Sequence, residues 1–278
     1  MALCALKPIL IKPPSKHKTR TWKFAGEFLI RKQFQKDQVK FGAWTREQII
    51  ELGPTFIKLG QIASSRVDLY PLEFTRELES LQDDVPPIDR DTIVNMIETH
   101  VNSGTFSYFD HEPFKSASIG QVHKATLQNG KEVVVKLRRP KIYEIMKSDT
   151  DNIKQIVTFL ENVGIDTGTN TGYVLDESID YLLAETDYEQ ETKNAKKFRK
   201  SLKKIDWMKI PEVHEQLCTP DMIVMEYVPS EKLYEISDSK VNRKKVCEAL
   251  INSYVIQTMD KGFFHADPHP GNLGFSND

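Results

Sequence analysis

The segment His265–Asn272 brings together the residue types that phosphoryl transfer needs. It reads His-Ala-Asp-Pro-His-Pro-Gly-Asn, so Asp267 and Asn272 are five positions apart. In phosphoryl-transfer loops with this spacing, the carboxylate orients the accepting hydroxyl and the amide oxygen holds Mg²⁺. Two other interpretations stay open for the segment alone. It could be a turn rich in proline and histidine, or a metal site made by His265, Asp267 and His269.

A lysine at the end of an apolar strand could bind phosphates. Lys136 follows Val133-Val134-Val135, and an ammonium group placed there can reach the α and β phosphates when a carboxylate holds it. Just before this strand, Ser116–His123 contains one glycine among small residues. Such a loop lets backbone amides approach phosphate groups. The alternatives are a solvated lysine at a strand edge and a turn into an ordinary hairpin.

Two further clusters could take part in the same chemistry. Residues 185–191 read Glu-Thr-Asp-Tyr-Glu-Gln-Glu, and Asp187 and Glu191, four residues apart, are predicted to share one helix face. One acid of this cluster could pair with Lys136, although acidic helix faces are usually solvated. The glycine of Lys58-Leu59-Gly60-Gln61 costs a helix about 1 kcal/mol relative to alanine. A close approach to a ligand or, more simply, a helix packing contact would explain it.

The hydrophobic pattern predicts mostly helices before residue 106 and a mixture of strands and helices after it. Apolar residues at helical spacing predict helices over 24–52, 55–66, 71–82, 89–102, 141–163, 174–203 and 240–261. Strands are predicted over 118–126 and 132–138, joined by the hairpin signal Asn129-Gly130, and over 222–228. This order is that of a protein-kinase small lobe that leads into its catalytic loop.

Composition and charge narrow the class of protein. The chain has 278 residues, 39% hydrophobic and 28% charged, which is typical of a globular protein with one large or two modest domains. Its net charge of -2 argues against broad electrostatic binding of nucleic acid. Three scattered cysteines favour a reducing compartment over a disulfide scaffold, and no apolar run is long enough to predict a transmembrane helix.

Basic residues without acids mark the start of the chain. Six lysines and arginines precede the first acid, Glu27. This pattern is typical both of an organelle-targeting segment and of a solvated basic arm, and the sequence leaves both interpretations open.

Together these segments resemble the UbiB (aarF-domain, ADCK-like) family of atypical kinases. In order, that family carries K-x-G-Q, an alanine-rich loop ending in Ser-Ile-Gly-Gln-Val, a strand lysine, E-x-D followed by a lysine-pairing glutamate, and H-x-D-P-H-P-G-N. The matching residues are Lys58–Gln61, Ser118–Val122, Lys136, Glu185–Glu191 and His265–Asn272. Five motifs in this order are far more specific than any one of them. The resemblance covers about residues 41–278, and Gly-Asn-Leu-Gly near the end is similar to plastid members.

The resemblance implies an α+β protein-kinase-like fold with an antiparallel small-lobe sheet, a helical N-terminal extension and only part of the large lobe. The expected ranges are a basic arm in 1–40, the extension in 41–105, the small lobe in 106–228 and the start of the large lobe in 229–278. The extension would partly cover a nucleotide pocket. No Asp-Phe-Gly follows the catalytic loop before Asp278. The chain is therefore expected to be a fragment, a truncated gene model or a degenerate copy.

ATP and Mg²⁺ are the cofactors that the resemblance implies. The catalytic residues would be Asp267, Lys136 and Glu191, and Asn272 would hold the metal. The nucleotide-binding residues would be Ala117, Ser118, Ile119, Gly120, Gln121, Val122, Lys136, Glu226, Val228, Lys58, Gln61, Glu185 and Asp187.

The sequence is compatible with three hypotheses for the function of this protein. The first is an ATPase or small-molecule kinase that supports prenylquinone or lipid metabolism, with an unknown small-molecule or lipid acceptor. A peripheral membrane or a lipid-biosynthetic complex would be its partner. The second is a nucleotide-binding pseudokinase that regulates such a complex, and the third is a helical scaffold without a nucleotide site. The expected location is a plastid (thylakoid or plastoglobule), a mitochondrion or, in a prokaryote, the cytoplasmic membrane face.

Overall fold

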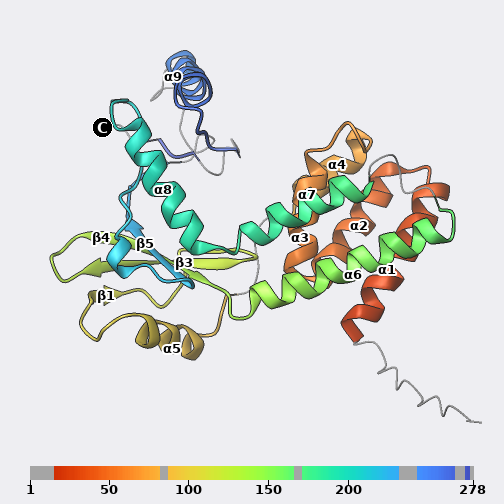
Figure 1. Cartoon of the computed structure of the whole chain (residues 1–278), viewed down its shortest axis with the longest axis horizontal. Helices are drawn as coiled ribbons and strands as arrows, with labels where there is room; N and C mark the ends of the chain where they lie inside the picture. The colour runs from red at the N-terminus through yellow and green to blue at the C-terminus, as the bar shows by residue number, and fades with distance from the viewer. Residues whose placement is uncertain (1–15, 82–86, 166–170, 232–242, 267–272, 276–278) are drawn as a thin grey trace, which may run out of the picture. The chain divides into compact units, whose positions relative to one another are not determined.

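The computed structural model describes residues 16–81, 87–165, 171–231, 243–266 and 273–275. The chain forms two compact units, one from residues 1–85 and 141–186 and the other from 86–140 and 187–278 (Figure 1). The units are interleaved in sequence, whereas the predicted domains are consecutive ranges. Residues 141–186, which follow the central hairpin, thus belong with the helical extension.

The first unit, here called the helical unit, packs around an aromatic core. Its elements are α1 (Lys16–Phe34), α2 (Gln38–Leu52), α3 (Pro54–Ser64), α4 (Leu72–Glu79), α6 (Ile142–Asn162) and α7 (Thr171–Ala184). The rings of Phe41 and Phe74 lie 4.9 Å apart at the centre of this core, where both side chains are buried. The single helix predicted over 24–52 is wrong. The chain breaks at Asp37, whose carboxylate accepts a hydrogen bond from the Lys40 amide and caps α2.

The second unit, here called the lobe unit, is built on an antiparallel sheet. Its strands are β1 (Phe106–Phe109), β2 (Lys115–Ser116), β3 (Gly120–Leu127), β4 (Glu132–Arg138) and β5 (Met222–Glu226). The strand order is β1-β3-β4-β5, and β2 also pairs with β3. The predicted hairpin joins β3 to β4, and Gly130 takes a φ of 80° that favours glycine. The helices are α5 (Arg90–His100), α8 (Tyr188–Leu202) and α9 (Arg243–Val255). A 3-10 helix forms at Glu215–Leu217, and a π-helical segment at Ile256–Asp260 continues α9.

The two faces of this sheet have different neighbours. Side chains alternate between faces along a strand, so Val133, Val135 and Leu137 of β4 point one way and Lys136 the other. The three apolar side chains are buried in one cluster with Ile93 of α5. Figure 1 shows α5 on one side of the sheet and α8 rising from the other.

The predicted helix over 174–203 is two helices. It ends at Ala184 and begins again at Tyr188, with Asp187 as the N-cap whose carboxylate accepts from the Gln190 amide at 2.9 Å. The shared helix face predicted for Asp187 and Glu191 is therefore wrong, because Asp187 precedes the helix. Capping by Asp187 satisfies an amide that the first turn leaves without a partner.

Within the described residues, no helix has both the length and the apolar character needed to cross a bilayer.

Candidate functional site

The lobe unit places a lysine and a glutamate in direct contact at the centre of the sheet. Lys136 of β4 donates from Nζ to both carboxylate oxygens of Glu191 in α8, each at 2.8 Å. The side chains are 29% and 39% exposed, so this ion pair is open to solvent. The predicted pairing of these two residues is confirmed. It holds the ammonium group at a fixed place on the sheet, as phosphate binding would require.

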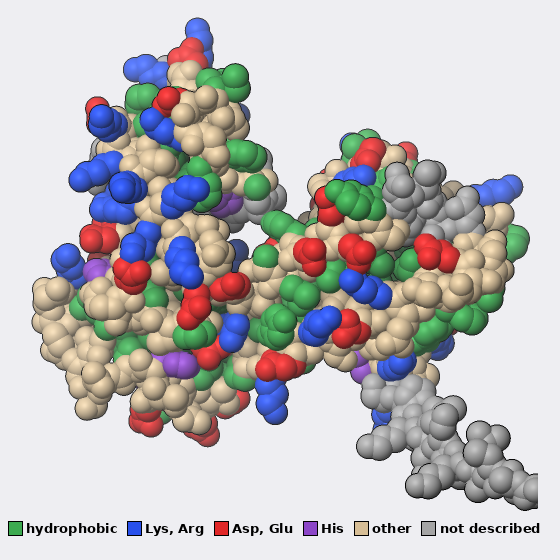
Figure 2. Space-filling view, viewed as in Figure 1, with side chains coloured by type: hydrophobic (Ala, Val, Ile, Leu, Met, Phe, Trp, Pro, Cys, Tyr) green, Lys and Arg blue, Asp and Glu red, His purple; other side chains and the backbone are tan. Residues whose placement is uncertain are grey.

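The charges of α8 explain why its first turn suits this pairing. Glu189 and Glu191 lie in the first turn, and Arg199 and Lys200 in the last. Acids near a helix N-terminus and bases near its C-terminus both interact favourably with the helix dipole. Figure 2 shows Lys and Arg side chains gathered over the surface that α8 occupies. The pair with Lys136 thus uses the acidic end of a helix whose other end is strongly basic.

The ring of Tyr188 packs against the Lys136 end of the ion pair. Its ring lies 4.6 Å from Nζ of Lys136, a cation–π arrangement, and its side chain is fully buried. The pKa of the Tyr188 hydroxyl is raised, mainly because the group is buried and secondly because the Glu191 carboxylate is close to it. This hydroxyl has no hydrogen-bond partner among the described residues. Sequence reasoning missed Tyr188. The capping pattern Asp187-x-x-Gln190 could have placed it at the first helical position, three residues before Glu191.

The predicted phosphate loop is a tight turn between β2 and β3. The Ala117 amide donates to the Gly120 carbonyl at 2.8 Å, closing the turn. Arg139 braces it from outside. The guanidinium donates to the Ala117 carbonyl and the Ser116 hydroxyl at 2.9 Å each, and its amide donates to the Ile119 carbonyl at 2.8 Å. Arg139 was not predicted as a site residue, because this bracing depends on contacts with a loop about twenty residues earlier.

Several side chains of this loop point into the lobe. Ser118, Ile119 and Gln121 are buried. The Gln121 amide group accepts from the Ile88 amide at 2.8 Å and contacts His123 Nε2 at 2.8 Å. Any ligand would therefore meet these residues mainly through their backbone. Val122 is partly buried within β3 and opposite Lys136 in the pairing with β4.

Gly120 occupies a position where no side chain fits. A Cβ atom there would collide with the Leu137 carbonyl oxygen and with the Tyr188 hydroxyl. The carbonyl belongs to the neighbouring strand and cannot move away cheaply. The glycine of the predicted phosphate loop therefore allows Tyr188, and with it the start of α8, to approach the sheet closely.

The helical unit holds the K-x-G-Q residues and the first acid of the acidic cluster. Lys58 Nζ lies 2.9 Å from Oε2 of Glu185, and the two side chains are 19% and 27% exposed. Gln61 donates to the Leu81 carbonyl at 2.9 Å. A Cβ on Gly60 would collide with the Leu81 side chain and lie 3.1 Å from Ile49 Cδ1. Close helix packing, the simpler of the two explanations, thus accounts for this glycine.

The remaining predicted site residues lie elsewhere or outside the described residues. Glu226 pairs with Lys209 at 2.6 Å. Burial acts to raise the pKa of the Glu226 carboxyl, but hydrogen bonds from Lys209 and from the Glu212 amide outweigh it and hold this pKa below its usual value. Val228 follows β5 and is partly buried. Asp267 and Asn272 lie outside the described residues. Within the described ranges, no group of three or more His, Cys, Asp or Glu side chains could hold a metal ion.

A five-stranded antiparallel sheet whose central lysine pairs with a helix glutamate is the small lobe of a protein-kinase-like fold. Residues 80–278 match the ABC1 atypical kinase-like domain. The chain belongs to this family, in agreement with the resemblance to UbiB kinases, and the protein-kinase-like fold class is confirmed.

Known relatives agree with this assignment. The chain is 38% identical over 264 residues to the protein ACTIVITY OF BC1 COMPLEX KINASE 7, chloroplastic, of Arabidopsis thaliana, covering 92% of this chain and 38% of that protein. It is 35% identical to the probable protein kinase UbiB of Pseudomonas entomophila, covering 84% of this chain and 44% of that protein. The chain thus spans less than half the length of these curated relatives.

A solved structure shares the fold. Rv3197 from Mycobacterium tuberculosis, determined in a complex with erythromycin, matches with a TM-score of 0.59 and 23% sequence identity. The match covers 92% of this chain and 63% of that one. At this level of identity the likeness concerns the fold alone.

Proposed function

We propose that this chain is the nucleotide-binding part of an ABC1-type atypical kinase or ATPase that uses MgATP and supports prenylquinone or lipid metabolism. The observation that carries the proposal is the Lys136–Glu191 ion pair, with 2.8 Å from Nζ to each carboxylate oxygen. Membership of the family supports phosphoryl chemistry in general. The ion pair supports a phosphate-binding site on the lobe unit.

The residues around the pair fit a bound triphosphate. The ammonium group of Lys136 is partly exposed and is kept in place by Glu191 and by the ring of Tyr188. The turn at Ser116–Ile119 is braced by Arg139, so its backbone would offer a rigid wall to a ligand. Bound MgATP would supply the transferable phosphoryl group. We assign the orienting carboxylate to Asp267 and the Mg²⁺ ligand to Asn272 from their five-residue separation.

The partners and location follow from the family and remain proposals. We propose an unknown small-molecule or lipid acceptor, reached at a peripheral membrane or within a lipid-biosynthetic complex. The names of several relatives in Arabidopsis thaliana include the word chloroplastic, which supports a plastid location for this protein. Lys58, Gln61, Glu185, Asp187, Glu226 and Val228 keep their proposed roles as nucleotide-binding residues.

Nucleotide titrations test the role of the ion pair. Binding of a fluorescent ATP analogue with Mg²⁺ would be measured for the unmodified chain and for Lys136→Met, Glu191→Gln and Lys193→Met. The first two changes should each weaken binding at least about 10-fold, which corresponds to about 1.4 kcal/mol. Lys193 is an exposed lysine two residues beyond Glu191, so Lys193→Met should bind normally. Unchanged binding by Lys136→Met would remove the proposal.

Turnover is tested separately with Asp267→Asn. If the chain hydrolyses ATP, this change should abolish most of the rate while binding stays within about 3-fold, because the carboxylate acts on the reacting group and not on affinity. A rate insensitive to the change would contradict the role of Asp267. Binding without any hydrolysis by the unmodified chain would instead favour a nucleotide-binding protein without turnover.

A further inference from the structure

Arg139 holds three oxygen atoms of the turn between β2 and β3. Its guanidinium donates from Nε to the Ala117 carbonyl and from Nη2 to the Ser116 hydroxyl, at 2.9 Å each. Its backbone amide donates to the Ile119 carbonyl at 2.8 Å. Two alternate carbonyls of the loop, those of Ala117 and Ile119, are therefore directed at Arg139.

The directions of these two carbonyls determine the directions of two amides. In a trans peptide unit the C=O and N–H bonds are coplanar and point in opposite directions, and none of the peptide bonds among the described residues is cis. The Ala117 carbonyl shares its peptide unit with the Ser118 amide, and the Ile119 carbonyl shares its unit with the Gly120 amide. Because Arg139 attracts both carbonyls, these two amides point away from Arg139.

The oriented amides belong to a loop that leads to the proposed phosphate site. Amides that gather at a turn form a concavity that binds anions such as phosphate. The Ala117 amide is already used, since it donates to the Gly120 carbonyl at 2.8 Å. The loop runs directly into β3, where Val122 is paired with Lys136 of β4. The amides that Arg139 orients thus lie just before the strand that flanks this lysine.

The surroundings of Arg139 suit a fixed brace. The residue is partly buried, and burial lowers the pKa of its guanidinium, but arginine stays charged at neutral pH. Hydrogen bonds from a charged donor are roughly twice as strong as neutral ones. Arginine presents its donors in a planar fork that reaches two acceptors at once, whereas lysine offers a single point charge. The oxygens of the neighbouring residues Ser116 and Ala117 match this fork.

We propose that Arg139 is a positioning residue of the nucleotide site, which holds two loop carbonyls so that the Ser118 and Gly120 amides face the phosphates of a bound nucleotide. The inference rests on the proposed function, because it takes these phosphates to lie beside Lys136. Arg139 itself does not contact the nucleotide in this arrangement. Once the guanidinium is removed, the Ala117 carbonyl is free to turn toward the phosphates, and its partly negative oxygen repels them.

Two ligands that differ only in their phosphates test this role. ATP and adenosine, each carrying the same fluorophore on the ribose, would be titrated with Mg²⁺ against the unmodified chain and Arg139→Met. This change should weaken the ATP analogue at least about 10-fold, mainly through faster dissociation in stopped-flow measurements. The affinity for the adenosine analogue should change less than about 2-fold, because it has no phosphates. Arg139→Lys keeps the charge but not the fork, so it should recover part of the loss.

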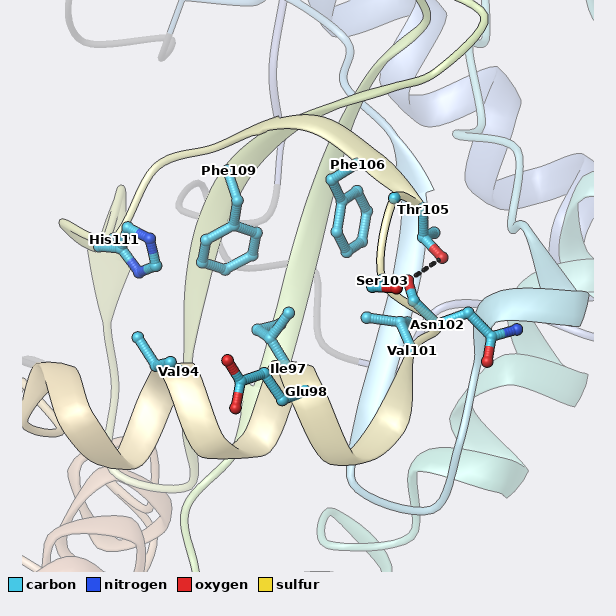
Figure 3. Close-up of a pocket in the computed structure, with 11 residues that line it drawn as sticks. Val94, Ile97, Glu98, Val101, Asn102, Ser103, Thr105, Phe106, Phe109 and His111 are labelled. Carbon is cyan, nitrogen blue, oxygen red and sulfur yellow. Dashed lines mark hydrogen bonds between the residues drawn. The ribbon is translucent and has the colours of Figure 1, made fainter.

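A change on the opposite face of the sheet is the matched control. Figure 3 shows Ile97 of α5 on the wall of a groove, across from Phe106 and Phe109. Ile97 packs against the core cluster of the lobe unit, which lies on the face of β4 opposite to Lys136. Ile97→Ala should therefore lower the stability of the lobe unit without changing the affinity for either analogue. Thermal unfolding measures the stability of every variant.

Hydrogen exchange of the nucleotide-free chain tests the brace itself. In Arg139→Met, peptides that cover residues 115–120 should exchange faster than in the unmodified chain, whereas peptides of α8 should be unchanged. Ser116→Ala removes one of the two acceptors of the guanidinium. Added to Arg139→Met, it should cause little further loss of affinity for the ATP analogue, because the shared contact is already gone.

Two results would reject the positioning role. One is an unchanged affinity of folded Arg139→Met for the ATP analogue. The other is an equal loss of affinity for both analogues, which would show general damage to the lobe unit. If the unmodified chain binds neither analogue, the proposed function fails and the inference with it, so the two failures are distinguishable. Should Arg139→Met not fold, Arg139→Lys provides the same comparison of the two analogues.

Discussion

At the scale of single residues, Gly120 and Tyr188 depend on each other. The glycine leaves room for the tyrosine hydroxyl next to the Leu137 carbonyl, and the tyrosine ring in turn lies under Lys136. This contact places the first turn of α8 against the sheet. The geometry of the Lys136–Glu191 pair therefore depends on the absence of a Cβ atom at Gly120.

Replacing this glycine should destabilise the lobe unit. Gly120→Ala inserts a methyl group against a carbonyl of the neighbouring strand and against the Tyr188 hydroxyl, and such overpacking costs about 1–3 kcal/mol. Tyr188→Phe alone should be neutral or stabilising by up to about 1 kcal/mol, because it removes a buried hydroxyl without a partner. Urea unfolding measures both changes.

The double variant separates the two collisions. Gly120→Ala combined with Tyr188→Phe should recover part of the lost stability, since only the collision with Leu137 remains. Full additivity of the two single changes in the free energy of unfolding would contradict the proposed contact.

The individual site residues differ in how well sequence reasoning could find them. Lys136 and Glu191 could be paired in advance, because each lies in a motif with a fixed order along the chain. Tyr188 and Arg139 could not, since their importance comes from contacts across the sheet and loop and not from spacing.

At the scale of elements, the break between α7 and α8 decides how the acidic cluster is used. Glu185 lies before the break and pairs with Lys58, Asp187 caps the new helix, and Glu191 pairs with Lys136. One continuous helix would direct these side chains differently. Hydrophobic periodicity alone predicted such a helix, because apolar spacing continues across the break, whereas the break is determined by a short capping signal.

Substitutions at Asp187 should separate its capping role from its charge. Asp187→Ala should cost about 1 kcal/mol in the free energy of unfolding, whereas Asp187→Asn should cost only a few tenths, because asparagine also caps helices. Urea unfolding measures both, and Asp89→Ala at the cap of α5 is the matched control for the loss of a cap.

Nucleotide binding is a second measurement on the Asp187→Ala and Asp187→Asn variants. If the Asp187 charge contacts bound MgATP, as proposed, Asp187→Asn should weaken binding although stability is kept. Equal losses of stability by the alanine and asparagine variants would argue against capping as the structural role.

At the scale of the whole molecule, each unit has its own hydrophobic core. The helical unit packs around Phe41, Phe74 and Leu78, and the lobe unit packs around Val133, Val135 and Leu137. The sequence indicated both the helical extension and the sheet. It could not indicate that α6 and α7 belong with the extension, because amphipathic helices of either unit have the same periodicity.

A truncation in one core tests whether the units unfold separately. Phe74 is 1% exposed and stacks on Tyr70 with centroids 5.0 Å apart, so Phe74→Ala should cost about 3–5 kcal/mol. Hydrogen exchange followed by mass spectrometry should show lost protection in peptides of α2, α3 and α4, with smaller losses in β3 and β4. Equal losses throughout would show that the chain unfolds as one cooperative body. Ile50→Ala, at an exposed position of α2, should leave both sets of peptides unchanged.

The buried carboxylate of Asp149 in α6 joins distant parts of the helical unit. It accepts from the Thr55 hydroxyl at 2.6 Å and contacts His17 Nε2 at 2.7 Å, and Thr55 and Asp149 are 94 residues apart. A ribosome adds about 5–20 residues per second, so Thr55 would leave the exit tunnel roughly 5–20 s before its partner. The strands β1 to β4 emerge during that interval. Until α6 emerges, Thr55 and His17 lack this carboxylate, so the helical unit can complete these two contacts only after the strands of the lobe unit have been synthesised.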